Sequence, residues 1–198
     1  MKRCDWCGTD PLYIAYHDDE WGVPLRDEGA MFEFLLLEGA QAGLSWITIL
    51  KKRDGYRAAF DQFDVHKVAR YTDRELDQRL LDTRIVRNRL KVYATRKNAQ
   101  ATLKLYDSGT TLLDYFWGFV DNEPIQNEWR TMADVPAQTP LSETISKDLK
   151  KRGFTFVGPT IVYAHMQATG MVNDHILSCP RHRACADLGR MDTGKKNT

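Results

Sequence analysis

The distribution of cysteine and histidine constrains the fold more than any other feature, because these residues gather near the two ends of the chain. The stretch VNDHILSCPRHRAC (residues 172–185) contains two of each, and the remaining two cysteines lie within the first seven residues, followed by His17. Four cysteines in 198 residues are too few for a disulfide scaffold. If one metal ion binds both groups, the fold must bring the two ends of the chain together.

One possible set of ligands takes two residues from each end: Cys4, His17, His175 and Cys179. Two thiolates and two imidazoles form the tetrahedral set that zinc prefers in closed structural sites. His175 and Cys179 would share a helix face if a turn of helix joined them. Spacing does not select this set, because rival ligands are present at Cys7, His182 and Cys185. The alternative without a metal is a group of ordinary thiols and surface histidines.

Helix signals recur along nearly the whole chain, and we therefore predict an all-α fold. Capping and breaking residues bound most of the expected helices: Ser45, a Thr72–Glu75 capping box, Thr111, Pro140 before Gly153, and Pro159 before Gly170. The expected helices are 46–60, 73–82, 87–106, 112–120, 141–152 and 160–169. The helix expected at 87–106 should carry a mostly apolar stripe formed by Leu90, Tyr93, Ala94, Lys97, Ala101 and Leu105. No alternating strand pattern of useful length is present.

Charge and hydropathy favour a soluble protein that is not strongly basic. The net charge is +1, and no apolar run approaches the roughly 20 residues that span a bilayer. The first residues have no apolar core typical of a secretory signal, so we expect a cytoplasmic location. Three local cationic clusters, at 50–53, 84–91 and 147–153, are typical of phosphate-contacting surfaces. For any single cluster, however, a solvated helix face is the favoured explanation.

Aromatic residues are dense in the first fifty positions: Trp6, Tyr13, Tyr16, Trp21 and Trp46. Such residues usually form core, but they also form pockets that stack a flat nucleobase on both faces. Glu38 interrupts the apolar run FEFLLLEGAQAGLSW. A buried carboxylate should meet a hydrogen-bond donor, and here it would accept from the amine of a purine. The alternative is an exposed glutamate at a helix C-terminus.

The segment KKRGFTFVGPTIVYAHMQATG (150–170) indicates two helices joined by a turn. Gly158, Pro159 and Thr160 stand at the start of the second helix, where free backbone amides would bind a DNA phosphate with Lys151 nearby. The arrangement resembles a helix-hairpin-helix motif. Phe156 stands where that motif has its first glycine, which predicts a less open loop.

These blocks together resemble the bacterial DNA-3-methyladenine glycosylase I family of the helix-hairpin-helix superfamily. The resemblance extends over nearly the whole chain, through RCDW, DPLYIAYHDDEWGVP, LEGAQAGLSWITILKKR, YRAAF, KKRGFTFVGPTI and GMVNDH. It implies one structural Zn²⁺ held by Cys4, His17, His175 and Cys179, which leaves Cys7, His182 and Cys185 unused. It also implies a base pocket formed by Glu38, as the catalytic residue, with Trp6, Tyr13, Tyr16 and Trp46.

The same resemblance implies that the loop with Gly43 and Leu44 wedges into DNA and fills the gap left by a flipped nucleotide. Many members of the wider superfamily have a catalytic aspartate two residues before a histidine, and Asn173 stands there in this chain. We assign no catalytic role to the adjacent Asp174.

The expected activity is base excision repair of alkylated double-stranded DNA. The enzyme would hydrolyse the N-glycosidic bond of 3-methyladenine and leave an abasic site, without lyase activity. Two alternatives are a zinc-stabilised module that binds DNA without chemistry and a hydrolase with zinc in its active site.

We expect a monomer with one functional unit over residues 1–190. It would comprise a central helical subdomain (about 45–170, with the hairpin at 142–170) and a second subdomain made of the two terminal segments. Residues 189–198 are expected to be disordered.

Overall fold

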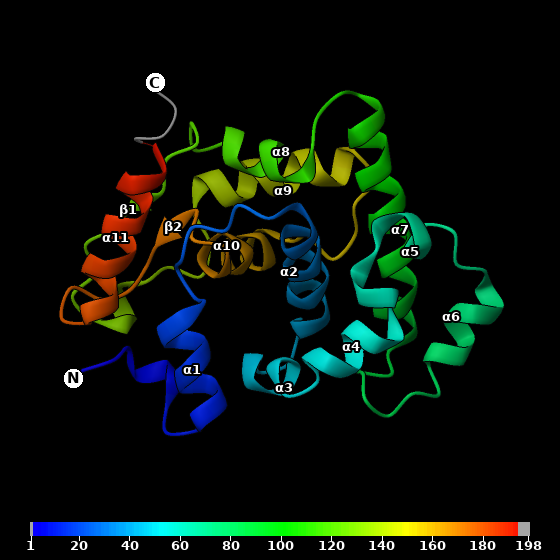
Figure 1. Ribbon diagram of the computed structural model, residues 1–198, viewed down its shortest axis with the longest axis horizontal. Helices are drawn as coiled ribbons and strands as arrows, with labels where there is room; N and C mark the ends of the chain where they lie inside the picture. The colour runs from blue at the N-terminus through cyan, green and yellow to red at the C-terminus, as the bar shows by residue number, and fades with distance from the viewer. Residues whose placement is uncertain (1, 194–198) are drawn as a thin grey trace.

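The computed structural model describes residues 2–193 and confirms the all-α class. This range contains eleven α-helices, most of them joined by short connections, whereas the longer segment 119–139 joins α8 to α9 (Figure 1). The α-helices are α1 (Pro11–Asp19), α2 (Glu28–Gln41), α3 (Trp46–Leu50), α4 (Arg53–Ala59), α5 (Val65–Val68), α6 (Asp73–Arg79), α7 (Arg89–Asp107), α8 (Leu112–Gly118), α9 (Pro140–Lys151), α10 (Pro159–Ala168) and α11 (Pro180–Thr193). Three 3-10 helices are η1 (Asp5–Cys7), η2 (Asp61–Phe63) and η3 (Met132–Asp134).

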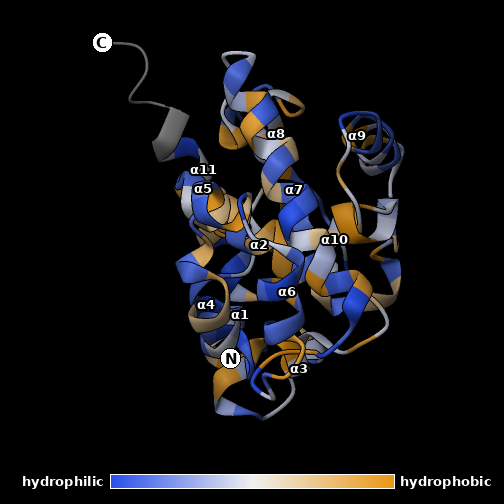
Figure 2. Cartoon of the chain, turned by 90° about the vertical axis from the view of Figure 1, so that its right-hand side faces the viewer, coloured by the Kyte–Doolittle hydropathy of each residue, from blue (hydrophilic) through white to orange (hydrophobic). Residues whose placement is uncertain are grey.

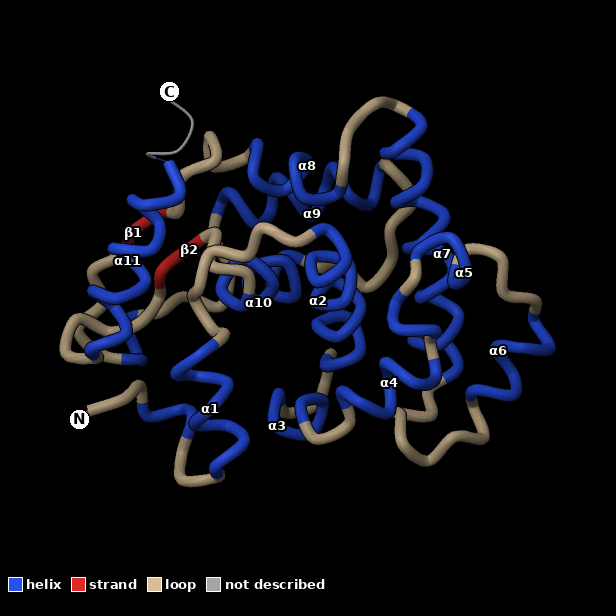
Figure 3. The backbone as a smooth tube through the Cα atoms, viewed as in Figure 1, coloured by secondary structure: helices blue, strands red, loops and turns tan. Residues whose placement is uncertain are grey.

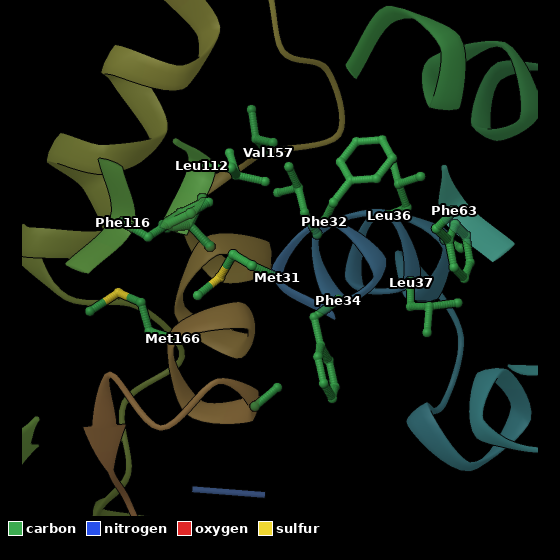
Figure 4. Close-up of a cluster of buried hydrophobic side chains, with 14 of the residues drawn as sticks. Met31, Phe32, Phe34, Leu36, Leu37, Phe63, Leu112, Phe116, Val157 and Met166 are labelled. Atoms are coloured by element: carbon green, nitrogen blue, oxygen red, sulfur yellow. The ribbon is translucent and has the colours of Figure 1, made fainter. Parts of the chain in front are cut away.

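Helix α2 is the central element of the core. Its residues 31–40 are all buried, and α3, α7, α8 and α10 pack around it. A helix that is apolar on every side is stable only when neighbours cover all of its faces. Figure 4 shows its side chains within the core, where Met31 lies near Phe116 of α8 and Met166 of α10. By contrast, α6 is hydrophilic apart from the buried Leu76 and is blue in Figure 2.

Most of the predicted helix limits are confirmed. Thr72 and Glu75 form the expected capping box, and the Thr111 side chain caps α8. Pro140 and Pro159 occupy the first positions of α9 and α10. Each of these signals acts within one helical turn, so it does not depend on the tertiary structure.

The predicted single helix 46–60 is wrong, because α3 and α4 are separated by a turn at residues 51–52. After the break, Arg53 forms ion pairs with Glu33 of α2 (2.5 Å) and with Glu20, the residue that follows α1 (2.5 Å). Ser45 precedes α3 but does not cap its backbone, because the Ser45 hydroxyl bonds to the Thr48 hydroxyl at 2.7 Å.

The predicted stripe of α7 is correct in its later part, where Ala94, Ala101 and Leu105 are buried. It is wrong at Leu90, which is 71% exposed because it lies in the first turn of the helix, on the face away from the core. Lys97 is also exposed.

Helices α1 and α11 lie on the same side of the molecule in Figure 1, and the N-terminal segment meets the chain that leads into α11, where Cys4 contacts His175 and His17 contacts Cys179. Two short strands, β1 (Ile125–Gln126) and β2 (Val172–Asn173), pair in parallel beside α11 (Figure 3). Two residues are too few to produce an alternating pattern, so the sequence did not indicate them. Helix α11 extends to Thr193 and so includes the first residues of the tail that was expected to be disordered, and residues 194–198 lie outside the described range. No described helix is both long and apolar enough to span a bilayer.

Candidate functional site

Four buried side chains from the two ends of the chain form a compact cluster: Cys4, His17, His175 and Cys179. Their ligand atoms all lie within 4.8 Å of one another. The Cys4 sulfur is 3.6 Å from Nδ1 of His175, and the Cys179 sulfur is 3.7 Å from Nε2 of His17. Tetrahedral zinc, with bonds of about 2.3 Å to sulfur and about 2.1 Å to nitrogen, requires sulfur–nitrogen separations of about 3.6 Å. The donor set therefore fits a zinc ion.

The second nitrogen of each histidine has its own partner, which fixes the orientation of the ring. Nδ1 of His17 lies 2.8 Å from the Asp18 carboxylate, and Nε2 of His175 lies 2.9 Å from the Trp21 carbonyl. Asp18 also accepts hydrogen bonds from Arg3, which, together with the one from His17, lower the pKa of Asp18 to about 2. Such outer partners orient metal-binding imidazoles. The nitrogens that remain are those that point into the cluster.

The rival ligands lie outside this cluster. The Cys7 thiol donates to the Cys4 carbonyl at 3.2 Å, and Nε2 of His182 contacts the Asn127 carbonyl at 2.7 Å. Cys185 is buried beside Arg181. His175 and Cys179 are joined by turns rather than by a helix, with the Cys179 amide donating to the Ile176 carbonyl. A local turn, rather than a turn of helix, therefore brings the two side chains to within 3.7 Å of each other.

A cavity of about 270 Å³ lies next to the cluster, between α1, α2, α3 and α10. Its lining residues are Trp6, Tyr13, Tyr16, Trp21, Glu38, Gln41, Trp46, Met132, Ala164 and Gln167. The structure thus brings together all five residues that were predicted to form a base pocket. Trp21 was noted only as one of the early tryptophans, and the remaining four residues were missed.

Aromatic rings form most of the cavity wall. The ring centroids of Trp6 and Tyr13 are 4.9 Å apart, and those of Tyr16 and Trp46 are 5.4 Å apart. The indole N–H groups of Trp6 and Trp46 are buried and have no hydrogen-bond partner within the described residues. Such a wall can stack a planar ring and still offer polar contacts at its edge.

Glu38 lies on this wall and is only 3% exposed. No described side chain or backbone amide donates a hydrogen bond to it, so the donor that a buried carboxylate should meet is not supplied by the described part of the protein. Burial without compensation raises the pKa of Glu38 from 4.5 to about 8. A buried acid without a partner in the wall of a cavity indicates that its partner is a ligand.

Asp174 is fully buried and receives four hydrogen bonds, which explains why this residue type is required there. Its donors are Asn127, Trp129, Tyr163 and Gln167, at 2.6 to 2.8 Å. Each carboxylate oxygen accepts two of these hydrogen bonds, so no lone pair is left to take a proton from a substrate or water, and Asp174 is unsuited to act as a general base. It instead fixes Gln167, whose amide lines the cavity.

The candidate DNA-contacting residues occupy two turns. Gly43 and Leu44 are exposed in the turn between α2 and α3, and Leu44 is 39% exposed. Gly158 is the N-cap of α10 and Pro159 its first residue, with Thr160 exposed beside them and Lys151 exposed at the end of α9. Phe156 adopts φ of +54°, the left-handed conformation that favours glycine.

Comparison with known proteins agrees with this geometry. The family model described as methyladenine glycosylase matches residues 6–182. DNA-3-methyladenine glycosylase 1 of Escherichia coli (strain K12) is 50% identical over 179 residues, which cover 90% of this chain and 96% of the relative.

Two solved structures are also similar. A crystal structure of 3-methyladenine DNA glycosylase I has a TM-score of 0.89 at 50% identity and covers 90% of this chain and 98% of its own. A variant of 3-methyladenine DNA glycosylase I in complex with 3-methyladenine has a TM-score of 0.88 at 36% identity, and the match covers 91% of this chain and 97% of the variant. The chain therefore belongs to the methyladenine glycosylase family.

Proposed function

We propose that this protein is a DNA repair glycosylase that excises 3-methyladenine from alkylated double-stranded DNA. The observation that carries the proposal is Glu38, a buried acid without a protein partner in an aromatic cavity. Relatives with the same fold have names that describe this activity, and one solved structure contains 3-methyladenine. The products are free 3-methyladenine and an abasic site.

The aromatic wall supplies the first part of recognition. Methylation at N3 makes the base cationic while it is attached to the sugar, so a ring stacked on Trp46 or Tyr16 gains a cation–π term of about 1–2 kcal/mol over neutral adenine. The positive charge also makes the base a good leaving group, so no general acid has to protonate it. Selection of the charged base therefore contributes directly to the rate.

Glu38 supplies the polar part of recognition. In the empty cavity its raised pKa keeps the carboxyl mainly protonated near pH 7. A cationic purine favours the ionised carboxylate, which can accept from the exocyclic amine and stabilise the positive ring. Neutral adenine provides less compensation for the buried charge.

The cavity composition supports a monofunctional hydrolase. A lyase step needs an amine nucleophile, and no lysine is among the lining residues of the described chain. Asp174 takes no part in proton transfer, since four donors already occupy its carboxylate.

We assign a structural zinc ion to the four clustered ligands, where it would cross-link the two ends of the chain. Four protein ligands leave no open position for a substrate or water. The chain's own residues then hold the pocket: His175 contacts the Trp21 carbonyl, and the His17 ring packs 5.3 Å from the ring of Trp6.

DNA contact is assigned to the two exposed turns. Gly158, Pro159 and Thr160 lie at the start of the ten-residue helix α10, where the amide N–H groups of Gly158 and Thr160 would hold a phosphate with Lys151, as in a helix-hairpin-helix motif. Leu44 would fill the gap left by the flipped base. We further propose a cytoplasmic monomer whose residues 1–190 act as one unit, with a central subdomain of about 45–170 and a second subdomain formed by the terminal segments.

The test is release of 3-methyladenine from methylated duplex DNA, detected by chromatography. Wild-type protein should release the base, and Glu38→Gln should release it more slowly while remaining folded. Well-folded wild-type protein that binds the duplex but releases no base would overturn the enzyme proposal and favour a non-catalytic DNA-binding module.

A further inference from the structure

The turn that carries Leu44 has a defined backbone conformation. Residues 41–44, which we call the wedge turn, have the angles of a type II β-turn, with Ala42 at φ −44° and ψ 117° and Gly43 at φ +77°. The Leu44 amide donates to the Gln41 carbonyl at 2.7 Å, and the Gln41 side chain donates to the Leu44 carbonyl at 3.2 Å. The wedge turn is therefore internally rigid, and its direction depends on how α2 ends.

Lys91 holds that end of α2 from outside. Its ammonium group reaches across from the first turn of α7 and donates to the carbonyls of Ala40 (2.8 Å) and Ala42 (2.5 Å). These carbonyls lie where α2 ends and the helix cannot satisfy its own acceptors. A cation at this position also compensates the negative end of the helix dipole. Lys91 belongs to the cationic cluster 84–91, yet it points at protein carbonyls.

Asn98 holds the second DNA-contacting turn from the same helix. It is 2% exposed, and its side-chain amide bonds to Thr155 in both directions, accepting from the amide (2.8 Å) and donating to the carbonyl (3.0 Å). Thr155 belongs to the α9–α10 turn (residues 152–158), which leads into the phosphate-binding start of α10. Phe156 of this turn packs against Gly39, where an added Cβ would lie 3.3 Å from the Cβ of Phe156.

Lys91 and Asn98 are seven residues apart, which is close to two helical turns, so they project from the same face of α7. Helix α7 packs against α2, and Lys91 on this face reaches the Ala40 carbonyl in the last turn of α2. One rigid helix is therefore bonded to both DNA-contacting turns. We propose that Lys91 and Asn98 are positioning residues that hold the wedge turn and the α9–α10 turn at a fixed separation, so that both engage one duplex together.

This inference rests on the proposed function, because only a protein that flips a base from a duplex needs the two contacts at once. The phosphates held by α10 and the gap filled by Leu44 belong to the same stretch of DNA. Their separation is set by the DNA, so the protein must match it. A displacement of about 1 Å away from the reacting bond can slow a reaction by about a hundredfold.

The test compares Lys91→Met with Lys104→Met, a change that removes the same charge from an exposed position in the last turn of α7. Three measurements are made: single-turnover release from methylated duplex, unstacking of a 2-aminopurine beside a tetrahydrofuran abasic site, and binding of free 3-methyladenine by tryptophan fluorescence. Melting curves establish that each variant is folded. If Lys91→Met is unfolded at the assay temperature, Lys91→Gln, which keeps one donor, is judged by the same criteria.

Lys91→Met should slow release by about tenfold or more and reduce the 2-aminopurine signal, while free-base affinity stays within about twofold. Lys91→Arg should restore most of the rate, and Lys104→Met should match wild type. Asn98→Asp, which sets a carboxylate against the Thr155 carbonyl, should weaken duplex binding while leaving free-base binding unchanged.

The proposal would be overturned if Lys91→Met released the base at the same rate as Lys104→Met. It would also be overturned if the release rate of Lys91→Met and its affinity for free 3-methyladenine fell by the same factor. Asn98→Asp with wild-type duplex affinity would also overturn it. Wild-type protein that releases no base would instead refute the proposed function.

Discussion

Replacing Glu38 with glutamine should make the empty protein more stable while making it a poorer enzyme. The carboxyl is 3% exposed and lacks a protein partner, so the folded protein holds it mainly in the protonated form near neutral pH. The unfolded chain, with an ordinary pKa of 4.5, ionises the same group in water. Folding at pH 7 must therefore take up a proton, which opposes folding.

The size of this effect follows from the two pKa values. Because the folded pKa is raised, the contribution of Glu38 to stability is fully present below pH 4.5 and is lost as the pH rises to about 8. The loss is about 1.4 kcal/mol per pH unit, which amounts to about 3 kcal/mol at pH 7. Glutamine has nearly the same shape and does not ionise. Glu38→Gln should thus raise the melting temperature by about 6–12 °C at pH 7 for a chain of this size.

The assay is a pair of thermal melts, of wild type and Glu38→Gln, repeated from pH 4.5 to pH 8.5. The difference between the two curves isolates Glu38, because every other titrating group, including the histidines of the metal cluster, is shared. The difference should be near zero at pH 4.5 and should widen up to about pH 8. A difference that stays constant across this range would refute the reasoning, because it would mean that Glu38 is not desolvated in the folded protein.

Three further predictions concern activity, the metal and the buried aspartate. The kcat/KM of wild type on methylated duplex should rise with pH up to about 8, because Glu38 ionises in the free enzyme over this range. The kcat/KM of Glu38→Gln should not change with pH and should be about 10–100-fold lower than that of wild type at pH 8. Parallel pH profiles of the two proteins would contradict this prediction. Cys179→Ala should lose bound zinc, measured by atomic absorption, and its free energy of unfolding should fall by at least about 3 kcal/mol. The control Cys185→Ala removes a buried thiol outside the cluster and should keep its zinc. Equal zinc content in the two variants would reject the ligand set. Asp174→Asn places an amide N–H₂ against two of the four donors and should lower the free energy of unfolding by about 2–4 kcal/mol. Loss of turnover with an unchanged free energy of unfolding would instead indicate that Asp174 takes part in the reaction.

The sequence was most informative where the cause of a structure is local. A capping threonine or a proline at the first position of a helix acts on amides within one turn, and the limits set by Thr72, Thr111 and Pro159 were predicted correctly. The break between α3 and α4 was missed, since it depends on ion pairs between Arg53 and the distant residues Glu20 and Glu33. Local signals cannot report a partner twenty or more residues away.

The same limit applies to the site. Spacing alone left Cys7, His182 and Cys185 as possible ligands, and only the family resemblance selected the set that the fold brings together. Gln167 gave no signal, because its place in the cavity wall depends on Asp174, which is itself held by residues from the loop after β1. The apolar run around Glu38 did mark that residue as exceptional. The sequence did not show that its partner is missing from the protein.

The position of the four-residue cluster explains how the proposed structural ion would affect recognition without touching the base. Residues 4–17 include three aromatic side chains that line the cavity: Trp6, Tyr13 and Tyr16. They pack against residues 175–179, which are more than 150 positions away in the sequence. Closing so long a loop is entropically unfavourable, and cross-linking both segments through one ion offsets that cost.

The chain is also shaped to bring the cluster close to the wall. Gly22, at φ +78°, lies against the ring of His175, where an added Cβ would be only 3.0 Å from ring atoms. The preceding residue, Trp21, accepts from the same ring through its carbonyl and lines the cavity with its indole. Loss of the ion should therefore loosen the aromatic wall first, and free-base affinity should fall before the α2 core unfolds.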